Sequence, residues 1–404
     1  MPSALPDGEP APPDGRLPAA ALAEAGGRTF GAYVHVPFCV TRCGYCDFNT
    51  YTAAELGGMS QRAYVDAVAA EVTLAHAVLG TPPPLTSIFF GGGTPTLLDA
   101  DEHVGIVSRL HDAFGMASDC EVTTEANPES VSLPQLQRLR EGGFNRISFG
   151  MQSAAPHVLE TLDRHHTAGR VAAAVADARR AGFDNVSIDL IYGTPGESVA
   201  DWTATVRETL ALGPDHVSAY ALIVEPGTAL ARRIARGELP DVDDDDQAEK
   251  YEIADRMFSE SGLQWYEVSN WATDDGTRCR HNVAYWRGQT WWGFGPGAHS
   301  HVGGVRWWNV KHPAAYVAQL AAGLSPAAAR EVLDDQTRSV ERVLLEVRLR
   351  DGLPIGLVND ADPVVRDLVA DGLVDPVALD SGRLVLTVSG RLLADLVLRR
   401  LLRD

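Results

Sequence analysis

Three closely spaced cysteines are the residues of this sequence best suited to chemistry. Cys39, Cys43 and Cys46 form a C-x3-C-x2-C pattern. Thiolates select zinc or the iron of iron–sulfur clusters, so three cysteines this close together predict one metal centre. A [4Fe–4S] cluster held by three cysteines leaves one iron open to an outside ligand. The alternative is a zinc site completed by a distant histidine, by Cys120 or by Cys279.

Glycines and polar residues follow the apolar segments that we expect to be strands. A glycine run occurs in FFGGGTPT, Glu125 in VTTEANPE and Gln152 in SFGMQS, while Asp189 lies in the apolar run before IYGTPGES. Ligands of α/β folds bind at the carboxyl ends of the strands, so these residues should share one mouth with the cysteines. Taken singly, each has a structural explanation, because glycine runs form tight turns and acidic residues cap helices.

The elements that must position these residues alternate regularly between residue 30 and about residue 225. Strand, helix and a second buried strand form a parallel βαβ unit. Six such repeats predict an α/β fold with a partial (β/α)6 barrel rather than a full barrel of eight. The expected strands are Ala32–Val36, Thr86–Phe90, Glu121–Glu125, Arg146–Phe149, Asn185–Leu190 and His216–Leu222, and the expected helices are Ser60–Val78, Asp101–Phe114, Ser132–Glu141, Thr167–Ala181 and Ser198–Leu212.

The composition narrows the class of ligand and the cellular compartment. The 404 residues include 34 basic and 54 acidic side chains, which gives a formal charge of −20. Proteins that bind nucleic acids use Lys and Arg to neutralise phosphates, so this charge predicts no nucleic-acid partner and favours small molecules. An odd number of cysteines, five, indicates a reduced, cytoplasmic protein rather than a disulfide framework. No apolar segment is long enough to span a membrane.

The regions outside the barrel differ from it in composition. Residues 1–29 are rich in proline and lack a signal-peptide pattern, so we expect a disordered leader. Residues 226–325 hold seven of the eight tryptophans and are expected to form an aromatic-rich region that completes the site. Residues 326–404 suggest helix, helix, a hairpin through residues 373–387 and a final helix. This order resembles a winged-helix module with a packing or interaction role.

The cysteine motif resembles that of the radical S-adenosylmethionine (SAM) superfamily. FCVTRCGYCDF carries the three cysteines and the aromatic Tyr45 before the last of them. The resemblance implies a [4Fe–4S] cluster whose open iron chelates the amino and carboxylate groups of SAM. It also implies an electron donor, because an electron passed into the cluster splits the sulfonium bond and yields a 5′-deoxyadenosyl radical.

The same resemblance implies a SAM site at the barrel mouth. Glycines without side chains let backbone groups approach the methionine amine closely. Carboxylates can accept hydrogen bonds from ribose hydroxyls or the ammonium, and Gln152 and Arg164 can hydrogen-bond the methionine carboxylate or the ribose. The residues expected at this site are Tyr33, Tyr45, Gly92, Gly93, Thr94, Glu125, Gln152, Arg164 and Asp189.

Further motifs extend the resemblance over most of the chain. AYVHVPFC, LDRHHT, YEVSNWA and GFGPGAHS are similar to segments of the oxygen-independent coproporphyrinogen III oxidase family. That family contains true oxidases and heme chaperones. True oxidases carry a fourth cysteine two residues after the last cluster ligand, and Phe48 stands at that position here.

A second local motif separates the two branches of the family. HNVAYW contains His281, Asn282, Tyr285 and Trp286, and it is similar to an H-N-x-x-Y-W motif of the heme chaperones whose histidine is implicated in heme binding. An imidazole is a good axial ligand for heme iron, and flat aromatic side chains offer apolar surface to the macrocycle. Without the resemblance, a lone histidine among tryptophans is more often a packing residue.

The resemblance therefore implies a heme chaperone that uses SAM and a [4Fe–4S] cluster and passes heme to an acceptor hemoprotein. A transient approach to a membrane would come through that acceptor, and no residue is assigned a catalytic role. The alternative is a coproporphyrinogen III oxidase that converts propionate groups to vinyl groups by hydrogen abstraction. Phe48 and HNVAYW argue against it. A binding protein with only structural zinc is a third hypothesis.

Overall fold

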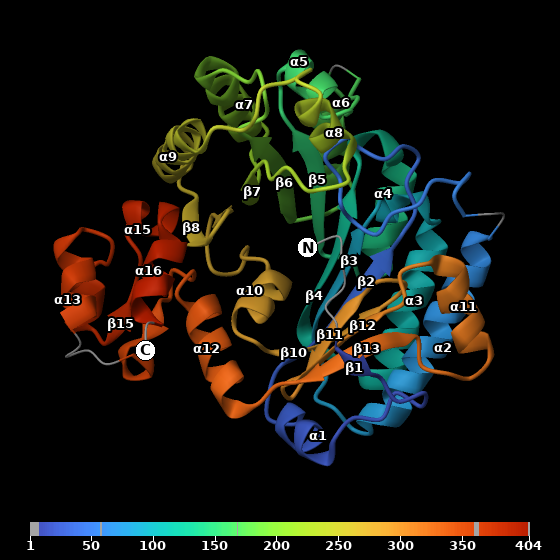
Figure 1. Cartoon of the computed structure of the whole chain (residues 1–404). Coiled ribbons are helices and arrows are strands. Elements are labelled where there is room, and N and C mark those ends of the chain that lie inside the picture. Colours follow the sequence, from blue (N-terminus) through green and yellow to red (C-terminus); the bar gives the residue numbers. More distant parts are fainter. Residues whose placement is uncertain (1–7, 57–58, 168, 359–362, 403–404) are drawn as a thin grey trace.

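One large curved sheet organises the protein. The structure is a computed structural model that describes residues 8–56, 59–167, 169–358 and 363–402. Within these residues the sheet has 13 strands, of which β10 and β2 to β7 run parallel and the others join antiparallel at both ends (Figure 1). In spatial order the strands are β1 (Glu9–Pro10), β13 (Ala327–Val332), β12 (Val305–Asn309), β11 (His299–Val302), β10 (Thr290–Phe294), β2 (Phe30–Val36), β3 (Leu85–Gly92), β4 (Met116–Ala126), β5 (Arg146–Gln152), β6 (Asn185–Tyr192), β7 (His216–Ala221), β9 (Asn270–Ala272) and β8 (Gln264–Glu267).

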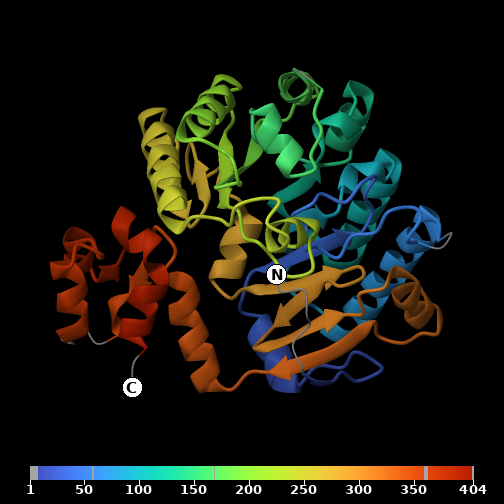
Figure 2. The ribbon, with the colours of Figure 1, turned by 45° about the horizontal axis from the view of Figure 1, so that its top comes forward.

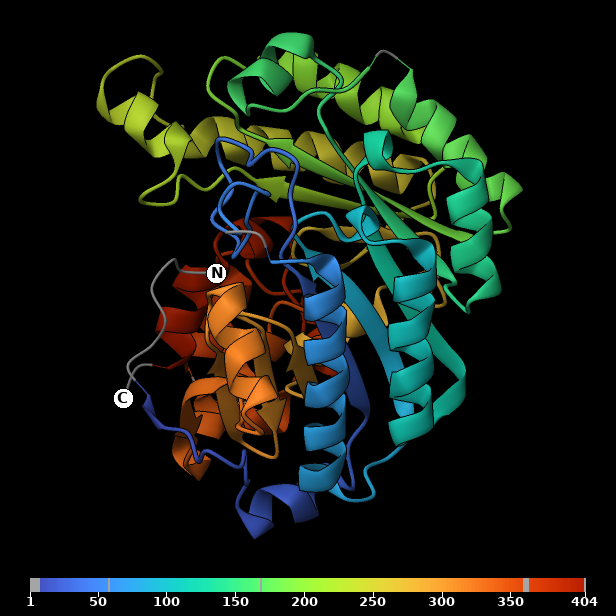
Figure 3. The same cartoon turned by 90° about the vertical axis from the view of Figure 1, so that its right-hand side faces the viewer.

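Helices on the outer face of the sheet connect its parallel strands (Figure 3). All six predicted strands and all five predicted helices are present, which confirms the α/β prediction. Polar residues begin several of the helices, as at α7, where Ser198 and Asp201 form a capping box. The helices as far as residue 321 are α1 (Ala19–Ala25), α2 (Gln61–Leu79), α3 (Ala100–Phe114), α4 (Leu133–Glu141), α5 (Pro156–Thr161), α6 (Arg170–Arg180), α7 (Val199–Ala211), α8 (Ala229–Ala235), α9 (Asp244–Glu260), α10 (Arg280–Trp286) and α11 (Pro313–Ala321).

Side chains along each strand point alternately to the core and to the concave face that carries the site. Side chains such as Phe90 and Ile188 are fully buried in the core. Their neighbours Phe89 and Asp189 point to the opposite, concave face, because successive side chains of a strand alternate. The concave face therefore carries polar and aromatic groups, and burial under the outer helices holds it in shape.

The C-terminal half extends the same sheet. Strand β10 lies parallel to β2, with Trp292 opposite Ala32, and so adds a seventh parallel strand to the six predicted. Strand β13 pairs with β12 and β1. The module boundary predicted at residue 326 is therefore wrong, because Ala327–Val332 belongs to the large sheet and only later residues form a separate core.

The predicted disordered leader is wrong for residues 8–29. Glu9–Pro10 pairs antiparallel with β13, and Leu17, Ala21 and Ala25 are buried against the main core. Proline lacks an amide donor but is tolerated at the edge of a sheet, and apolar burial fixes the rest of the segment. Residues 1–7 of the predicted leader lie outside the described residues.

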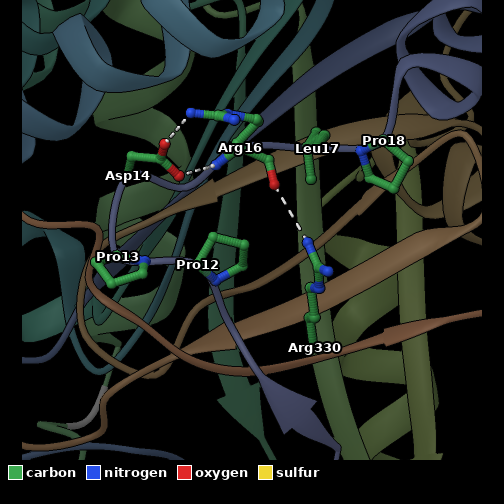
Figure 4. Close-up of a pocket in the computed structure, with 7 residues that line it drawn as sticks. All are labelled: Pro12, Pro13, Asp14, Arg16, Leu17, Pro18 and Arg330. Carbon is green, nitrogen blue, oxygen red and sulfur yellow. Dashed lines mark hydrogen bonds and ion pairs between the residues drawn. The ribbon is translucent and has the colours of Figure 1, made fainter.

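A pocket of about 550 Å³ lies between this N-terminal segment and β13. Arg330 reaches across it and donates to the carbonyl oxygen of Arg16 at 3.2 Å (Figure 4). Arg16 in turn pairs with Asp14 at 2.8 Å. None of the predicted site residues lines this pocket.

Residues after β13 form a helical module with its own apolar core, beside the barrel (Figure 2). The hairpin predicted through residues 373–387 is wrong in detail. A short helix occupies its turn, only the bridge between Val374 and Leu386 remains of its pairing, and β15 pairs with β14 instead. The elements are α12 (Asp335–Glu346), β14 (Leu353–Pro354), α13 (Pro363–Ala370), α14 (Pro376–Asp380), β15 (Arg383–Leu384), α15 (Val388–Leu392) and α16 (Ala394–Leu401).

None of the helices in the described ranges combines the length and the apolar character that a membrane crossing needs.

Candidate functional site

The loop that carries the three cysteines begins where β2 ends. The turn after β3 fastens this loop, because Gly93 N donates to Val36 O at 2.8 Å and Thr94 N donates to Phe38 O at 2.7 Å. Gly44 N also donates to Leu162 O at 3.1 Å. The loop therefore lies at the carboxyl ends of the parallel strands, where α/β folds bind ligands.

The cysteine thiols lie within electrostatic reach of one another. Burial is the main cause that raises the pKa of Cys39 and raises that of Cys46 to about 11. Arg164 Nη1 donates to Cys43 Sγ at 3.6 Å. No three His, Cys, Asp or Glu side chains of the described residues stand together as a metal-binding group. The number and softness of the three thiols fit an iron–sulfur cluster, but the loop does not hold them in a ready-made coordination shell.

The glycine run is required by close packing against the cysteine loop. A Cβ atom at Gly93 would lie 2.5 Å from Phe38 O and 3.0 Å from Cys39 Sγ. Gly92 has a φ of +111°, and a Cβ there would lie 2.6 Å from His35 Cε1. The glycines are therefore needed to form a tight turn, and this turn also places the backbone beside the first cysteine.

Two carboxylates from neighbouring regions of the sheet line the mouth. Glu125 Oε2 accepts a hydrogen bond from Gly92 N at 3.2 Å, and both oxygens of Asp189 accept from Ser148 Oγ at 2.8 Å. Burial, followed by the charge of Asp189, raises the pKa of Glu125 to about 8. Burial also raises the pKa of Asp189. A cation bound here would stabilise both charged carboxylates, which fits a sulfonium or ammonium group.

Gln152 and Arg164 converge at the end of β5. A Cβ at Gly150 would lie 2.8 Å from Gln152 Nε2 and 3.0 Å from Arg164 Nη2, so this glycine leaves room for both side chains. Gln152 has a φ of +68°, which is rare for a non-glycine residue and typical of strained functional positions. Arg164 Nη2 donates to Gly150 O at 3.1 Å, while its Nε is buried without a partner. That unpaired donor fits a carboxylate ligand.

The two predicted tyrosines lie at different depths. Tyr45 packs against the apolar cluster of α5 and α8, and burial raises its pKa. Tyr33 lies deeper, on the concave face of β2, where its hydroxyl lies 3.0 Å from His35 Nδ1. Its ring is 5.8 Å from that of His281. Tyr33 therefore connects the mouth to the HNVAYW motif.

Helix α10, which carries this motif, lies on the concave side of the sheet (Figure 1). Its first amides donate to the buried Glu121 of β4, with Arg280 N at 3.0 Å from Oε1 and His281 N at 3.4 Å. Arg146 Nη1 lies 3.9 Å from Glu121 and donates to Thr277 O at 2.7 Å. A carboxylate at a helix N-terminus satisfies free amides and the helix dipole, so Glu121 holds α10 inside the sheet.

His281 is the least solvated residue of the motif, with 3% of its surface exposed. Its ring stacks on Phe89 at 4.9 Å between centroids and lies edge-on to Tyr285 at 4.5 Å. Both ring nitrogens lack hydrogen-bond partners among the described residues. Burial lowers its pKa to about 3, so the imidazole stays neutral, the form that binds metals.

The other residues of the motif divide into two groups. Asn282 and Trp286 interact with the buried carboxylate of Glu267, which also accepts a hydrogen bond from Asn270. Tyr285 instead lies between His281 and Trp291, whose ring centroid is 4.4 Å away. Asn282 and Trp286 therefore anchor α10 to β8 and β9, whereas Tyr285 continues the aromatic surface beside His281.

Comparison with known proteins places this chain in a family. Residues 33–209 match the radical SAM superfamily. The heme chaperone HemW of Mycobacterium tuberculosis is 52% identical over 382 residues, which cover 94% of this chain and 97% of that protein. HemW of Bacillus subtilis is 37% identical over 280 residues, which cover 69% of this chain and 73% of that protein. This chain belongs to the HemW family.

A solved structure shows that this chain shares its fold with an oxidase. Coproporphyrinogen III oxidase (HemN) from Escherichia coli, a radical SAM enzyme, superposes with a TM-score of 0.79 at 24% identity. The match covers 94% of this chain and 92% of that chain. The predicted radical SAM fold and family are thus confirmed, while the likeness to the oxidase extends to the fold alone.

The sequence analysis missed Glu121 and Glu267, which position the HNVAYW motif. Glu121 lies four residues before the predicted Glu125 on β4, so both side chains face the same side of the strand. This spacing is a usable signal for a second inward carboxylate. Glu267 belongs to YEVSNWA, a segment noted only for its resemblance. Neither residue could be connected to α10 without knowing that α10 lies inside the sheet.

Proposed function

We propose that this protein is a heme chaperone that binds heme and transfers it to an acceptor hemoprotein. The observation that carries the proposal is His281, a neutral imidazole with two unpaired nitrogens among aromatic rings. Heme iron takes imidazole as an axial ligand, and the porphyrin needs flat apolar surface. The family membership supports the same function, because the relatives above are named as heme chaperones.

The cofactors would occupy the mouth above α10. Cys39, Cys43 and Cys46 would hold the [4Fe–4S] cluster, and the residues predicted for SAM would hold that cofactor. When bound, the cluster supplies a one-electron reductant for the sulfonium. Arg164 would pair with the methionine carboxylate through its unpaired Nε, and Glu125 and Asp189 would face the cationic part of the cofactor.

Heme access to His281 requires α10 to move. His281 is buried in this conformation, and α10 is held at its N-terminus by Glu121 and along its side by Glu267. Heme binding would therefore compete with these anchors. An electron donor would serve the cluster in the cytoplasm, and a membrane would be approached only through an acceptor located there.

The decisive experiment compares two activities of the same preparation. The cluster is reconstituted anaerobically, and heme binding and coproporphyrinogen III turnover are assayed side by side. We expect a stoichiometric heme complex that donates heme to an apo-hemoprotein, without protoporphyrinogen IX. Catalytic formation of protoporphyrinogen IX would instead establish the oxidase, and a colourless protein containing zinc but no iron or sulfide would contradict both.

His281→Ala should lower the heme affinity while leaving the cluster intact, since α10 contributes none of the three cysteines. The measurements are a heme titration followed in the Soret band and the visible spectrum of the cluster. His111→Ala, a change at an exposed site near the end of α3, is the control. An unchanged heme affinity in His281→Ala would place the ligand elsewhere.

Cys43→Ala should abolish the iron signal, because two remaining thiolates cannot hold the cluster stably. Iron and sulfide are determined after anaerobic reconstitution. Cys120→Ala is the matched control, since Cys120 is a buried thiol on β4 outside the cysteine loop. Full iron content in Cys43→Ala would refute the assigned ligands.

A further inference from the structure

We propose that His301 on β11 is an outer heme ligand, with the indole of Trp291 on β10 as the surface on which the porphyrin lies. This inference rests on the proposed function, since it names a second contact for the same cargo. His301 follows directly after the GFGPGAHS segment, and Trp291 lies just before it.

The hydrogen bonding of His301 suits a metal ligand. Its Nδ1 lies 2.9 Å from Gln289 O, so this nitrogen carries the proton and donates to the carbonyl. A histidine that binds a metal typically donates its other ring nitrogen to a backbone carbonyl in this way, which fixes the tautomer and the ring orientation. Nε2 makes no hydrogen bond to any residue in the described ranges, and the side chain is only partly buried.

Aromatic rings connect His301 to the interior. The ring centroid of Trp291 is 5.1 Å from that of His301, and the Trp291 indole is fixed by a 3.1 Å hydrogen bond from its Nε1 to His299 O. Tyr285 lies 4.4 Å from Trp291 and 4.5 Å from His281. Trp291, Tyr285 and His301 are partly exposed, whereas His281 is buried. Heme iron can therefore meet His301 before α10 moves, and the ring series leads from there to His281.

The groups around His301 favour a neutral imidazole and include arginines that a carboxylate ligand can bind. Burial lowers the pKa of His301, the nearby Arg28 and Arg338 lower it further, and Gln289 O and Glu341 oppose the shift. Arg306 stands directly opposite His301 on β12. The three arginines pair with Glu24, Glu331 and Glu341. Heme propionates would compete with these glutamates, because guanidinium binds carboxylates in a forked geometry.

The test separates the two histidines by kinetics. Ferric heme is mixed anaerobically with the reconstituted full-length protein, and the Soret change is followed by stopped flow. His301→Gly should slow heme association and weaken the first complex by at least about tenfold, the scale on which even an outer partner of a metal ligand changes metal affinity. Added imidazole should restore the rate. His281→Ala should keep the fast association and lose the final affinity.

His299→Ala is the matched control, because His299 lies two residues away on the same face of β11. It should behave as the wild type. The inference is overturned if His301→Gly associates with heme at the wild-type rate, or if imidazole fails to rescue a folded His301→Gly protein, as checked by circular dichroism. Absence of heme binding by the wild type would overturn the proposed function. Normal heme binding by the wild type, with no effect of His301→Gly, would overturn only this inference.

Discussion

Several buried carboxyl groups of this protein have raised pKa values. Burial raises the pKa of Glu71 to about 7 and the pKa values of Glu125 and Glu267 to about 8. Glu71 is compensated by hydrogen bonds from Tyr316 Oη at 2.6 Å, Asn309 Nδ2 at 2.8 Å and Gly295 N at 2.9 Å. Glu125 accepts a hydrogen bond from one backbone amide, that of Gly92.

These shifts predict that the three carboxyls make the ligand-free protein less stable as the pH rises. Each carboxyl has a higher pKa in the folded state than its ordinary value of 4.5, so the folded state binds more protons between the two values. The stabilisation is complete below about pH 4.5 and is lost as the pH rises through 7 to 8. Urea unfolding from pH 7 to pH 9 measures it, because the buried histidines are neutral in both states in that range. Glu125→Gln should flatten the slope. A slope of the opposite sign would contradict the assignment.

At the scale of elements, the turn after β3 helps to hold the cysteine loop in place. This turn fastens the loop through Gly93 N and Thr94 N, and its glycines permit a backbone approach that any side chain would block. The loop is also held at Gly44, which donates to Leu162 O and accepts from Leu230 N, and at Asn49, which donates to Pro296 O and Lys311 O. Its geometry therefore depends on several elements, of which β3 is one.

Gly93→Ala should lower the iron content after reconstitution, because its Cβ would lie 2.5 Å from Phe38 O and force the loop away from β3. Iron and sulfide analysis measures the effect. Gly105→Ala in α3 is the matched control, since its Cβ would meet no atom within 4 Å. That change should leave the iron content unchanged and stabilise the helix by about 1 kcal/mol. Equal iron content in both variants would show that the turn does not position the cysteines.

For the whole molecule, Arg391 is one of several residues that join the C-terminal module to the barrel. Arg391 of α15 binds Asp255 of α9 through two hydrogen bonds of 2.9 and 2.8 Å, and its guanidinium lies 4.3 Å from the ring centroid of Trp265. Trp271 Nε1 donates to the same carboxylate at 2.9 Å. The pair is almost completely buried. The module is thus fixed to α9, β8 and β9, and β8 also carries Glu267.

Arg391→Met should destabilise the protein by about 3–5 kcal/mol, because removing one partner leaves the Asp255 carboxylate buried without its cation. Urea unfolding gives the free energy, and limited proteolysis should show earlier cleavage between β13 and α12. Arg400→Met breaks the exposed pair with Asp371 and should cost less than about 1 kcal/mol. Similar losses in both variants would mean that the Arg391 contact is not a specific attachment.

Much of this architecture follows from local patterns in the sequence. Period-2 strands and capped helices specify the βα units, and parallel strands necessarily gather Gly93, Glu125, Gln152 and Asp189 at one end. The C-x3-C-x2-C spacing similarly places the cysteines in the loop after β2. These features depend on short separations along the chain, which a sequence displays directly.

Only the tertiary structure shows what lies inside the curved sheet. Glu121 contacts Arg280 across 159 residues, and β1 pairs with β13 at the opposite end of the chain. Such contacts have no local signature, so the ordered N-terminal segment and the placement of α10 could not be predicted. The sequence by itself determined the fold class, the family resemblance and the candidate ligands. Packing decided that His281 is buried and His301 partly exposed, because burial depends on which distant elements share a face.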